Sequence, residues 1–257
     1  MYYSKKSLGQ NFLIDQNIIR KIINLRNIKN KDVVEIGPGN GALTDEILNL
    51  NPSSLIVIEK DNFLIEKLKE KYKKIKSIKF YNDDILKIDL EKIIKKNSII
   101  FGNLPYNISS QILVKFIKFK KWPPKYSNLI FMFQKEVAAK ILGKSYGRLS
   151  IIANYRLKSL SKFDVSANCF FPKPKVTSTV IHLVPLKKII YNIKNIENLE
   201  LITNKFFSNK RKKINKKIKE IFSSEQINKF KDLNLNYRPS DLKKEFYYQA
   251  VEIYETG

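Results

Sequence analysis

The sequence of 257 residues has a single cysteine, Cys169, and a single histidine, His182. One thiol cannot form an internal disulfide or a multi-cysteine zinc site, and one imidazole has no histidine partner for a metal cluster. We therefore expect no metal ion in this protein. We treat both Cys169 and His182 as structural residues.

Long apolar runs are also missing. Stretches such as Leu129–Phe133 are far shorter than the roughly 20 residues that cross a bilayer, and the first residues contain no apolar signal core. We expect a cytoplasmic protein with no membrane partner. Because 43% of the residues are hydrophobic and 12% are aromatic, the chain can still bury a substantial core.

Acidic residues are scarce: 24 Asp and Glu stand against 49 Lys and Arg, which gives a formal net charge of +25. Codon bias can supply part of this excess, because 43 of the basic residues are lysines. The distribution is more informative than the total. Residues 32–91 hold 12 of the acidic residues, whereas residues 92–135 hold none and carry nine lysines. Such segregation predicts a surface that faces a polyanion such as nucleic acid.

Short apolar runs alternate with segments of helical length through residues 33–133. This alternation is typical of a doubly wound, mostly parallel α/β sheet. We expect a first helix capped by Asp15, with Ile18, Ile19, Ile22 and Ile23 at helical spacing. The expected strands are Val33–Ile36, Leu55–Ile58, Ile78–Tyr81, Ser98–Phe101 and Leu129–Phe133, and the helices between them include Leu43–Leu50, Phe63–Tyr72 and Ser109–Phe119.

The last part of the chain changes in character. We expect Thr177–Val184 to be an antiparallel strand at the edge of the sheet. Lys- and Asn-rich helices follow, and one of them is expected to carry Phe207, Ile214, Ile218, Ile221 and Phe222 on a common face. We therefore place a first domain at residues 1–186 and a small C-terminal helical domain at residues 187–257.

The segment Val33–Gly41 predicts a strand that runs into a G-x-G-x-G turn, where Gly37 and its neighbours let a ligand approach the backbone. Glu59 ends the next strand, 22 residues after Gly37, where a carboxylate can accept both ribose hydroxyls. Asp84 follows the third strand, within reach of an adenine amino group. A nicotinamide dinucleotide and S-adenosylmethionine both contain adenosine, and the glycine spacing favours S-adenosylmethionine.

The motif Phe101–Tyr106 follows the fourth strand, at the same edge of the sheet as the glycine loop. An exocyclic amine such as adenine N6 is a poor nucleophile, because its lone pair is delocalised into the ring. The Asn103 side-chain oxygen and the Leu104 carbonyl can accept both of its N–H groups, while Pro105 stiffens the loop and Tyr106 stacks on the base. The alternative is that these residues only form a turn.

With these motifs the sequence resembles the small-subunit ribosomal RNA adenine N6,N6-dimethyltransferases, the RsmA/KsgA group, over nearly its whole length. The segments that carry the resemblance also include Leu8–Leu13, Gln134–Glu136, Tyr146–Ser150 and Phe170–Ser178. The resemblance implies a Rossmann-like class I methyltransferase sheet. It also implies that Asn11 and Leu13, together with Gly37, Glu59, Asp84 and Asn103, bind S-adenosylmethionine.

The resemblance gives Phe170 the role of holding a flipped adenine against Tyr106, although a large aromatic residue beside a proline-rich loop is equally consistent with packing. Lys210, Arg211, Lys212 and Lys213 resemble a basic family segment that binds RNA, but Lys210 stands where a second arginine is usual. A solvated Lys-rich face is the alternative for this segment.

The resemblance thus implies methyl transfer to N6 of two adjacent adenosines near the 3′ end of 16S rRNA during small-subunit biogenesis. The expected partner is 16S rRNA in the immature small ribosomal subunit, and we expect the protein to be a monomer. Two other functions stay open. One is a related 23S rRNA adenine methylase, and the other is a non-catalytic RNA-binding assembly factor.

Overall fold

The computed structural model describes residues 10–230 and 233–256 of the chain. These residues form two compact units. The first unit falls within residues 1–138 and 158–185, and the second within residues 139–157 and 186–257. The chain therefore passes between the units more than once, because residues 139–157 group with the C-terminal part. The boundary that we placed between a first domain, residues 1–186, and a C-terminal domain, residues 187–257, stays a prediction.

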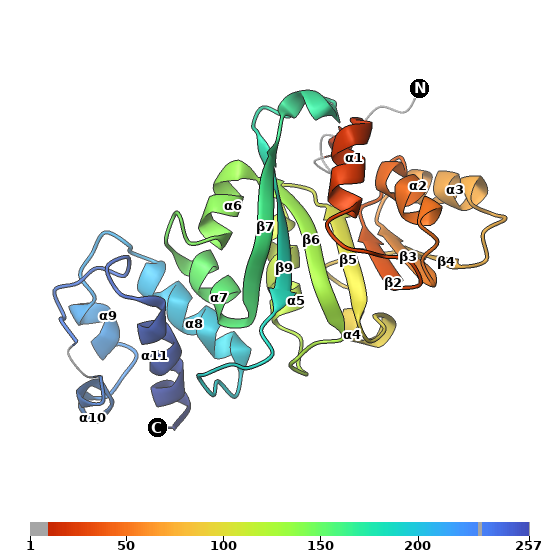
Figure 1. The fold of residues 1–257 in the computed structure, drawn as a ribbon. Helices are drawn as coiled ribbons and strands as arrows, with labels where there is room; N and C mark the ends of the chain where they lie inside the picture. The colour runs from red at the N-terminus through yellow and green to blue at the C-terminus, as the bar shows by residue number, and fades with distance from the viewer. Residues whose placement is uncertain (1–9, 231–232, 257) are drawn as a thin grey trace. The chain divides into compact units, whose positions relative to one another are not determined.

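The main sheet belongs to the first unit and has the strand order β4-β3-β2-β5-β6-β9-β7 (Figure 1). Neighbouring strands from β4 to β6 pair in parallel, and β9 pairs antiparallel with β6. The mostly parallel α/β sheet predicted from the sequence is thereby confirmed. The strands are β2 (Asp32–Ile36), β3 (Ser54–Glu59), β4 (Ile78–Asn82), β5 (Ser98–Asn103), β6 (Tyr126–Gln134), β7 (Leu157–Val165) and β9 (Ser178–Pro185).

The strand order reverses beside β2. The chain runs from β2 outward through β3 to β4, and then returns to the other side of β2 as β5. In an open α/β sheet such a reversal leaves a crevice at the carboxyl ends of the strands. Ile36 of β2 lies opposite Gly102 of β5. The glycine loop and the Asn103 motif therefore leave the sheet side by side.

One detail of the predicted topology is wrong. The strand expected at 177–184 forms as β9 and is antiparallel to β6, but it is not the outermost strand, because β7 lies beyond it. The apolar residues of β7 are separated by polar ones, at Leu157, Leu160, Phe163 and Val165, and most of its side chains are at least partly exposed. It contains no continuous apolar run, which is the signal that identified the other strands.

Helices cover both faces of the sheet. Helices α1 (Gln16–Ile23), α2 (Ala42–Asn49) and α3 (Asn62–Lys71) contribute to a buried cluster with sheet residues such as Val57 and Phe101. Helix α5 (Ser109–Ile117) covers the opposite face, where the Phe116 ring lies 5.5 Å from the ring of Phe131. The short helix α4 (Leu90–Ile93) precedes β5, and α6 (Lys135–Ile141) follows β6.

Helix α1 begins as the sequence predicted. The Asp15 side chain accepts hydrogen bonds from the backbone N–H groups of Asn17 and Ile18, at 2.9 and 3.0 Å. These bonds satisfy donors that have no partner within the first helical turn. Ile19, Ile22 and Ile23 are buried in the core. This packing anchors the helix that precedes β2 and the glycine loop.

A second, two-stranded sheet pairs the N-terminal segment with the proline-rich loop. Strand β1 (Phe12–Leu13) is antiparallel to β8 (Phe170–Phe171), which follows the 3₁₀ turn Ala167–Cys169. Phe12 lies opposite Phe171, and Leu13 lies opposite Phe170. This pairing holds the N-terminal segment against residues that are far away in the sequence.

The second unit is helical. It contains α7 (Arg148–Arg156), α8 (Ile196–Phe207), α9 (Asn215–Lys219), α10 (Ser224–Asn228) and α11 (Lys244–Thr256). Aromatic rings fill its core, where Phe206 packs edge-on against Phe246 and Tyr247 at 5.6 and 5.7 Å. The Tyr248 hydroxyl donates to the backbone carbonyl of Ile151 at 2.8 Å, which ties α11 to α7.

The single helix expected to carry Phe207 to Phe222 does not form. Phe207 ends α8, Ile214 precedes α9, and Phe222 follows α9 after Ile221. The apolar spacing repeats across a turn at residues 208–213, so the periodicity alone did not reveal the break.

In the described ranges, 10–230 and 233–256, no helix combines the length and apolarity that a membrane span requires.

Candidate active site

A cavity of about 250 Å³ opens at the carboxyl ends of β2, β3 and β5. Most of the residues predicted from the sequence line it. These are Asn11, Leu13, Gly37, Glu59, Asp84, Asn103, Leu104, Pro105 and Tyr106. Phe170 is not among the lining residues, and Leu8 and Gly9 of the N-terminal motif lie outside the described part of the chain. The fold thus brings together residues from five separate segments of the chain.

The glycine loop forms one wall of the cavity. Gly39 has a φ of +58°, and a Cβ there would lie 2.7 Å from the ring of Phe12. Gly41 has a φ of +87°, and a Cβ there would lie 2.7 Å from the Tyr72 hydroxyl. Larger residues at these positions would be strained and would also displace the aromatic neighbours. The glycines therefore allow the loop to lie between Phe12 and Tyr72.

Glu59 ends β3 and faces the cavity. Its side chain is only 9% exposed, and burial raises the pKa of this carboxyl above its ordinary value. Backbone N–H groups oppose that effect: Asp61 donates to Oε1 at 2.9 Å, and Gly39 and Lys60 also donate to the carboxylate. Backbone groups from the glycine loop and from the residues after Glu59 therefore fix the orientation of its carboxylate.

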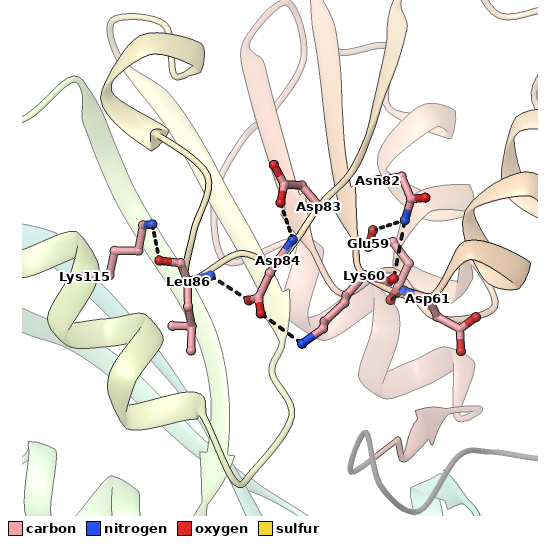
Figure 2. A network of polar contacts seen from close by, with 8 residues as sticks. All are labelled: Glu59, Lys60, Asp61, Asn82, Asp83, Asp84, Leu86 and Lys115. Carbon is pink, nitrogen blue, oxygen red and sulfur yellow. Dashed lines mark hydrogen bonds and ion pairs between the residues drawn. The ribbon is translucent and has the colours of Figure 1, made fainter.

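Asp84 also lines the cavity, and Figure 2 shows the polar contacts that hold it. Its Oδ1 accepts from the backbone N–H of Leu86 at 2.9 Å, and its Oδ2 lies 2.9 Å from the Lys60 ammonium. The Leu86 hydrogen bond and then the Lys60 ion pair hold the pKa of Asp84 below its ordinary value. Asp84 is therefore ionised and fixed in orientation at neutral pH.

Two further contacts support this acidic wall (Figure 2). The Asn82 amide donates to the backbone carbonyl of Glu59 at 3.0 Å. The Lys115 ammonium of α5 donates to the backbone carbonyl of Leu86 at 2.8 Å, and burial lowers the pKa of Lys115. These bonds join the ends of β3 and β4 to each other and to α5.

Asn103 forms the opposite wall. Its Nδ2 donates to the backbone carbonyl of Asn11 at 2.9 Å. Because the amide nitrogen is used in this way, the orientation of the amide is set, and Oδ1 is the atom that can accept hydrogen bonds from a ligand. A Cβ at Gly37 would lie 3.7 Å from the Asn103 carbonyl oxygen. The glycine loop and the Asn103 motif are therefore in contact.

Tyr106 is fixed by a residue from the far side of the proline-rich loop. Its hydroxyl lies 2.5 Å from the hydroxyl of Ser178, the first residue of β9. Burial raises the pKa of Tyr106, so its hydroxyl is neutral. The backbone carbonyl of Tyr106 accepts from Ser109 at 3.1 Å, which anchors the motif to the start of α5.

The neighbouring residues Phe170 and Phe171 occupy opposite environments. Phe170 is 3% exposed and belongs to the hydrophobic core with Leu13 and Val180. Phe171 is 67% exposed. In this structure Phe170 therefore packs in the core, which is the alternative considered for it from the sequence.

Glu35 lies behind the glycine loop and is completely buried. Its Oε2 accepts from the Thr44 hydroxyl at 2.6 Å, and its Oε1 has no hydrogen-bond partner among the described residues. Burial raises the pKa of Glu35 to about 8. We therefore expect Glu35 to be largely protonated at neutral pH.

The basic segment Lys210–Lys213 lies in the second unit, in the turn between α8 and α9, and all four side chains are exposed. It precedes a helix, as predicted. The Lys213 ammonium donates to the Asn236 side-chain oxygen at 3.0 Å. The cavity lies wholly in the first unit.

The sequence did not identify several residues that support the cavity. Lys60, Asn82 and Ser178 each hold a residue that lines it, and Gln10 donates to Asp61 at 3.3 Å. Lys60 directly follows Glu59, so its position at the end of the strand could have been predicted from the sequence. The contacts of Asn82 and Ser178 join distant segments, and no local pattern indicates them.

Both residues assigned as structural are buried. The His182 ring Nε2 lies 2.8 Å from Asn128 Oδ1 between β6 and β9, and burial lowers the pKa of His182. Cys169 is 9% exposed within the core. Among the residues that the structure describes, no group of three or more His, Cys, Asp or Glu residues is placed to hold a metal ion.

Known proteins resemble this chain over nearly its whole length. The model of the family "Ribosomal RNA adenine dimethylase" matches residues 1–256. The ribosomal RNA small subunit methyltransferase A of Pelagibacter ubique is 42% identical over 258 residues, which cover 98% of this chain and 97% of that protein. The protein of the same name from Buchnera aphidicola is 41% identical and covers 89% of this chain and 88% of its own length.

Solved structures show the same fold. A dimethyladenosine transferase from Plasmodium falciparum has a TM-score of 0.76 at 24% identity and covers 95% of this chain and 98% of its own. The 23S rRNA methyltransferase ErmE has a TM-score of 0.69 at 21% identity, with coverage of 95% and 100%. The fold is that of the class I methyltransferases, and the full-length family match shows that this chain belongs to the ribosomal RNA adenine dimethylase family.

Proposed function

We propose that this protein transfers methyl groups from S-adenosylmethionine to N6 of two adjacent adenosines near the 3′ end of 16S rRNA, giving N6,N6-dimethyladenosine. The observation that carries this proposal is the Asn103 amide, whose nitrogen is bound to Asn11 and whose oxygen is therefore available on a cavity lined by Glu59 and Asp84. The small-subunit methyltransferases among its relatives support the choice of RNA.

The donor set of the cavity fits S-adenosylmethionine, which supplies an electrophilic methyl group on a sulfonium when bound. Glu59 accepts hydrogen bonds from the ribose hydroxyls, and Asp84 accepts from the adenine amino group. Gly37 lets the backbone approach the ligand. Asn11 and Leu13 line the cavity from the N-terminal segment and close over it. The carboxylates also favour a cationic ligand over a neutral one.

The Asn103 motif prepares the accepting amine. Asn103 Oδ1 and the Leu104 carbonyl accept the two N6–H groups, which orients the nitrogen lone pair toward the cofactor side of the cavity. Pro105 limits the motion of the loop, and Tyr106, whose hydroxyl is bound to Ser178, stacks on the adenine. Positioning and fixed hydrogen-bond acceptors supply the catalysis.

Phe170 is proposed to hold the extruded adenine from the side opposite Tyr106. The target base must leave its stack to reach the cavity, because N6 is blocked within a paired helix. Phe170 is buried before RNA binds, so this role requires the β8 segment to move and expose the ring when the base enters.

The exposed segment Lys210–Lys213 is proposed to contact RNA phosphates. Replacing Lys210, Arg211, Lys212 and Lys213 together by Gln is expected to weaken binding to 16S rRNA and to reduce its salt dependence, with S-adenosylmethionine affinity unchanged. Filter binding at several salt concentrations measures both effects. An unchanged salt dependence would assign this segment to solvent alone.

The proposed partner is the immature small ribosomal subunit, and the proposed location is the cytoplasm. We further propose that the protein acts as a monomer. Light scattering of the purified protein checks the oligomeric state.

Mass spectrometry tests the proposed reaction directly. Purified protein and S-adenosylmethionine are incubated separately with unmethylated small-subunit and large-subunit particles, and the nucleosides of each RNA are then analysed. Dimethyladenosine in 16S rRNA alone is the expected result. Methylation only in 23S rRNA would identify the related large-subunit methylase, and RNA binding without methylation would identify an assembly factor.

A further inference from the structure

An exposed aromatic ring lies beside the cavity and has no part in the reaction proposed above. Phe171 is 67% exposed, although its neighbour Phe170 is buried in the core. A phenylalanine gains little by remaining in water, because burying an apolar side chain is favourable. The exposed ring of Phe171 is therefore free to be covered by a partner, and its position decides which kind of partner fits.

The pairing of β1 and β8 places this ring at the rim of the cavity. Phe171 lies directly opposite Phe12, and directly opposed residues of an antiparallel pair project from the same face. Phe12 lines the cavity and packs against Gly39. Phe171 therefore projects from the same face of the ladder as Phe12, next to a residue that lines the cavity, whereas Phe170 projects from the other face into the core.

The loop that follows Phe171 is attached to the cavity at both ends. It starts from β8, which is paired with β1, and it ends at Ser178, whose hydroxyl lies 2.5 Å from that of Tyr106. The backbone N–H of Lys135 donates to the Thr177 carbonyl at 3.0 Å and gives a third attachment. The residues between these attachments therefore border the side of the cavity where Tyr106 lies.

The charge around Phe171 matches a polyanion. Lys173 and Lys175 are both exposed in the same loop. No acidic residue occurs from Val165 to Ile196. An exposed aromatic ring flanked by lysines is the combination that binds unpaired nucleotides, with the base stacked on the ring and the phosphate near the ammonium groups.

We propose that Phe171 is a stacking site for an unpaired RNA base that neighbours the methylated adenosine, and that Lys173 and Lys175 bind the phosphates of that nucleotide. This inference rests on the proposed RNA methylation. It adds to that proposal a second base-binding position, outside the cavity, which selects single-stranded RNA around the target.

Two substitutions of Phe171 separate stacking from simple apolar contact. Phe171→Leu keeps an apolar side chain but removes the flat ring, and Phe171→Trp keeps a ring. We expect Phe171→Leu to raise the KM for immature small subunits roughly 5- to 100-fold, with S-adenosylmethionine affinity unchanged. Phe171→Trp should retain a KM close to that of the wild type.

The tryptophan variant also gives a direct optical signal. The wild-type chain has one tryptophan, Trp122, which provides the baseline. RNA binding should quench the added fluorescence of Phe171→Trp because the base stacks on the indole. Leu160→Ala and Leu160→Trp are matched controls, since Leu160 is an exposed apolar residue of β7, 53% exposed. Neither is expected to change the KM, and the Leu160→Trp signal should not respond to RNA.

The outcomes distinguish this inference from the proposed function. If wild-type protein methylates 16S rRNA and Phe171→Leu has an unchanged KM, the stacking site is wrong and the methylation proposal stands. An equal loss in Phe171→Leu and Phe171→Trp would also overturn stacking, because it would show a shape-specific contact such as a protein surface. If the wild-type protein does not methylate 16S rRNA, the proposed function fails first.

Discussion

The two walls of the cavity differ in charge and in how they are held. The wall at the ends of β3 and β4 carries the carboxylates of Glu59, Asp83 and Asp84. The wall after β5, residues 103–108, has no charged side chain. A cationic cofactor is stabilised by the first wall, whereas an acidic group on the second would repel RNA and attract a proton to the amine-binding site.

The walls are also supported differently. The carboxylates are held mainly by backbone N–H groups and lysines from their own strand ends, as Glu59 is by Asp61 and Asp84 is by Leu86 and Lys60. Asn103 and Tyr106 depend instead on Asn11 and Ser178, which are distant in sequence. The carboxylates are thus held mainly by contacts local to the ends of β3 and β4, whereas Asn103 and Tyr106 also need β1 and β9 in place.

The largest effect is expected from breaking the amine wall with Asn103→Ala. The substitution removes the fixed acceptor for N6–H, and we expect kcat for methyl transfer to fall by about 10²-fold or more, the scale seen when one preorganised hydrogen-bonding group is lost. Binding to ribosomal precursor should survive. Single-turnover methylation with radiolabelled cofactor, together with filter binding, measures the two quantities.

Asn49→Ala is the control for this experiment, since Asn49 is an exposed residue at the end of α2 and does not line the cavity. It should retain full activity. Unchanged methyl transfer in Asn103→Ala would refute the role given to this side chain.

A smaller effect is expected from the acidic wall with Glu59→Gln. Gln keeps the shape of the side chain but loses the charge, so the ribose hydroxyls lose a charge-assisted hydrogen bond. We expect S-adenosylmethionine to bind roughly 10-fold more weakly and RNA affinity to stay the same. Isothermal titration calorimetry measures the cofactor affinity.

Glu66→Gln provides the matched control, because Glu66 is exposed on α3, with 67% of its side chain accessible. Equal cofactor affinity in Glu59→Gln and in the wild type would contradict the assignment of Glu59. A loss of RNA affinity instead would reverse the roles given to the two walls.

The difference between the walls also explains what the sequence could predict. Glu59 and Asp84 follow strands with continuous apolar runs, so their positions at the sheet edge could be inferred from spacing. Asn103 was placed by the same reasoning. Strand β7 was missed because its one-sided exposure removes that apolar run.

Contacts across long sequence separations were not predictable. The bond between Tyr106 and Ser178 and the bond between Asn103 and Asn11 exist only because β9 and β1 reach the cavity. The different environments of Phe170 and Phe171 depend likewise on pairing with β1. Two adjacent phenylalanines are chemically identical and have the same strand propensity. Only the pairing of β8 with β1 determines which ring is buried and which is exposed.

The smallest effect on methyl transfer is expected at Glu35, which lies behind the glycine loop and does not line the cavity. Its pKa is about 8 in the folded protein, above the ordinary value of 4.5, because burial disfavours the charged form. As pH rises from about 4.5 to about 8, the unfolded chain loses this proton while the folded chain keeps it. The free energy of unfolding should therefore fall over this range.

In the wild type the Thr44 hydroxyl donates to Glu35 Oε2 at 2.6 Å. Glu35→Gln removes the titration and keeps an acceptor for this hydroxyl. We expect the variant to lose less stability than the wild type between pH about 5 and about 8, as measured by urea unfolding across that range. Glu70→Gln, at a side chain that is 72% exposed, should follow the wild type. Parallel curves for Glu35→Gln and the wild type would mean that Glu35 is already ionised in the folded protein, and the acidic wall would then extend behind the glycine loop.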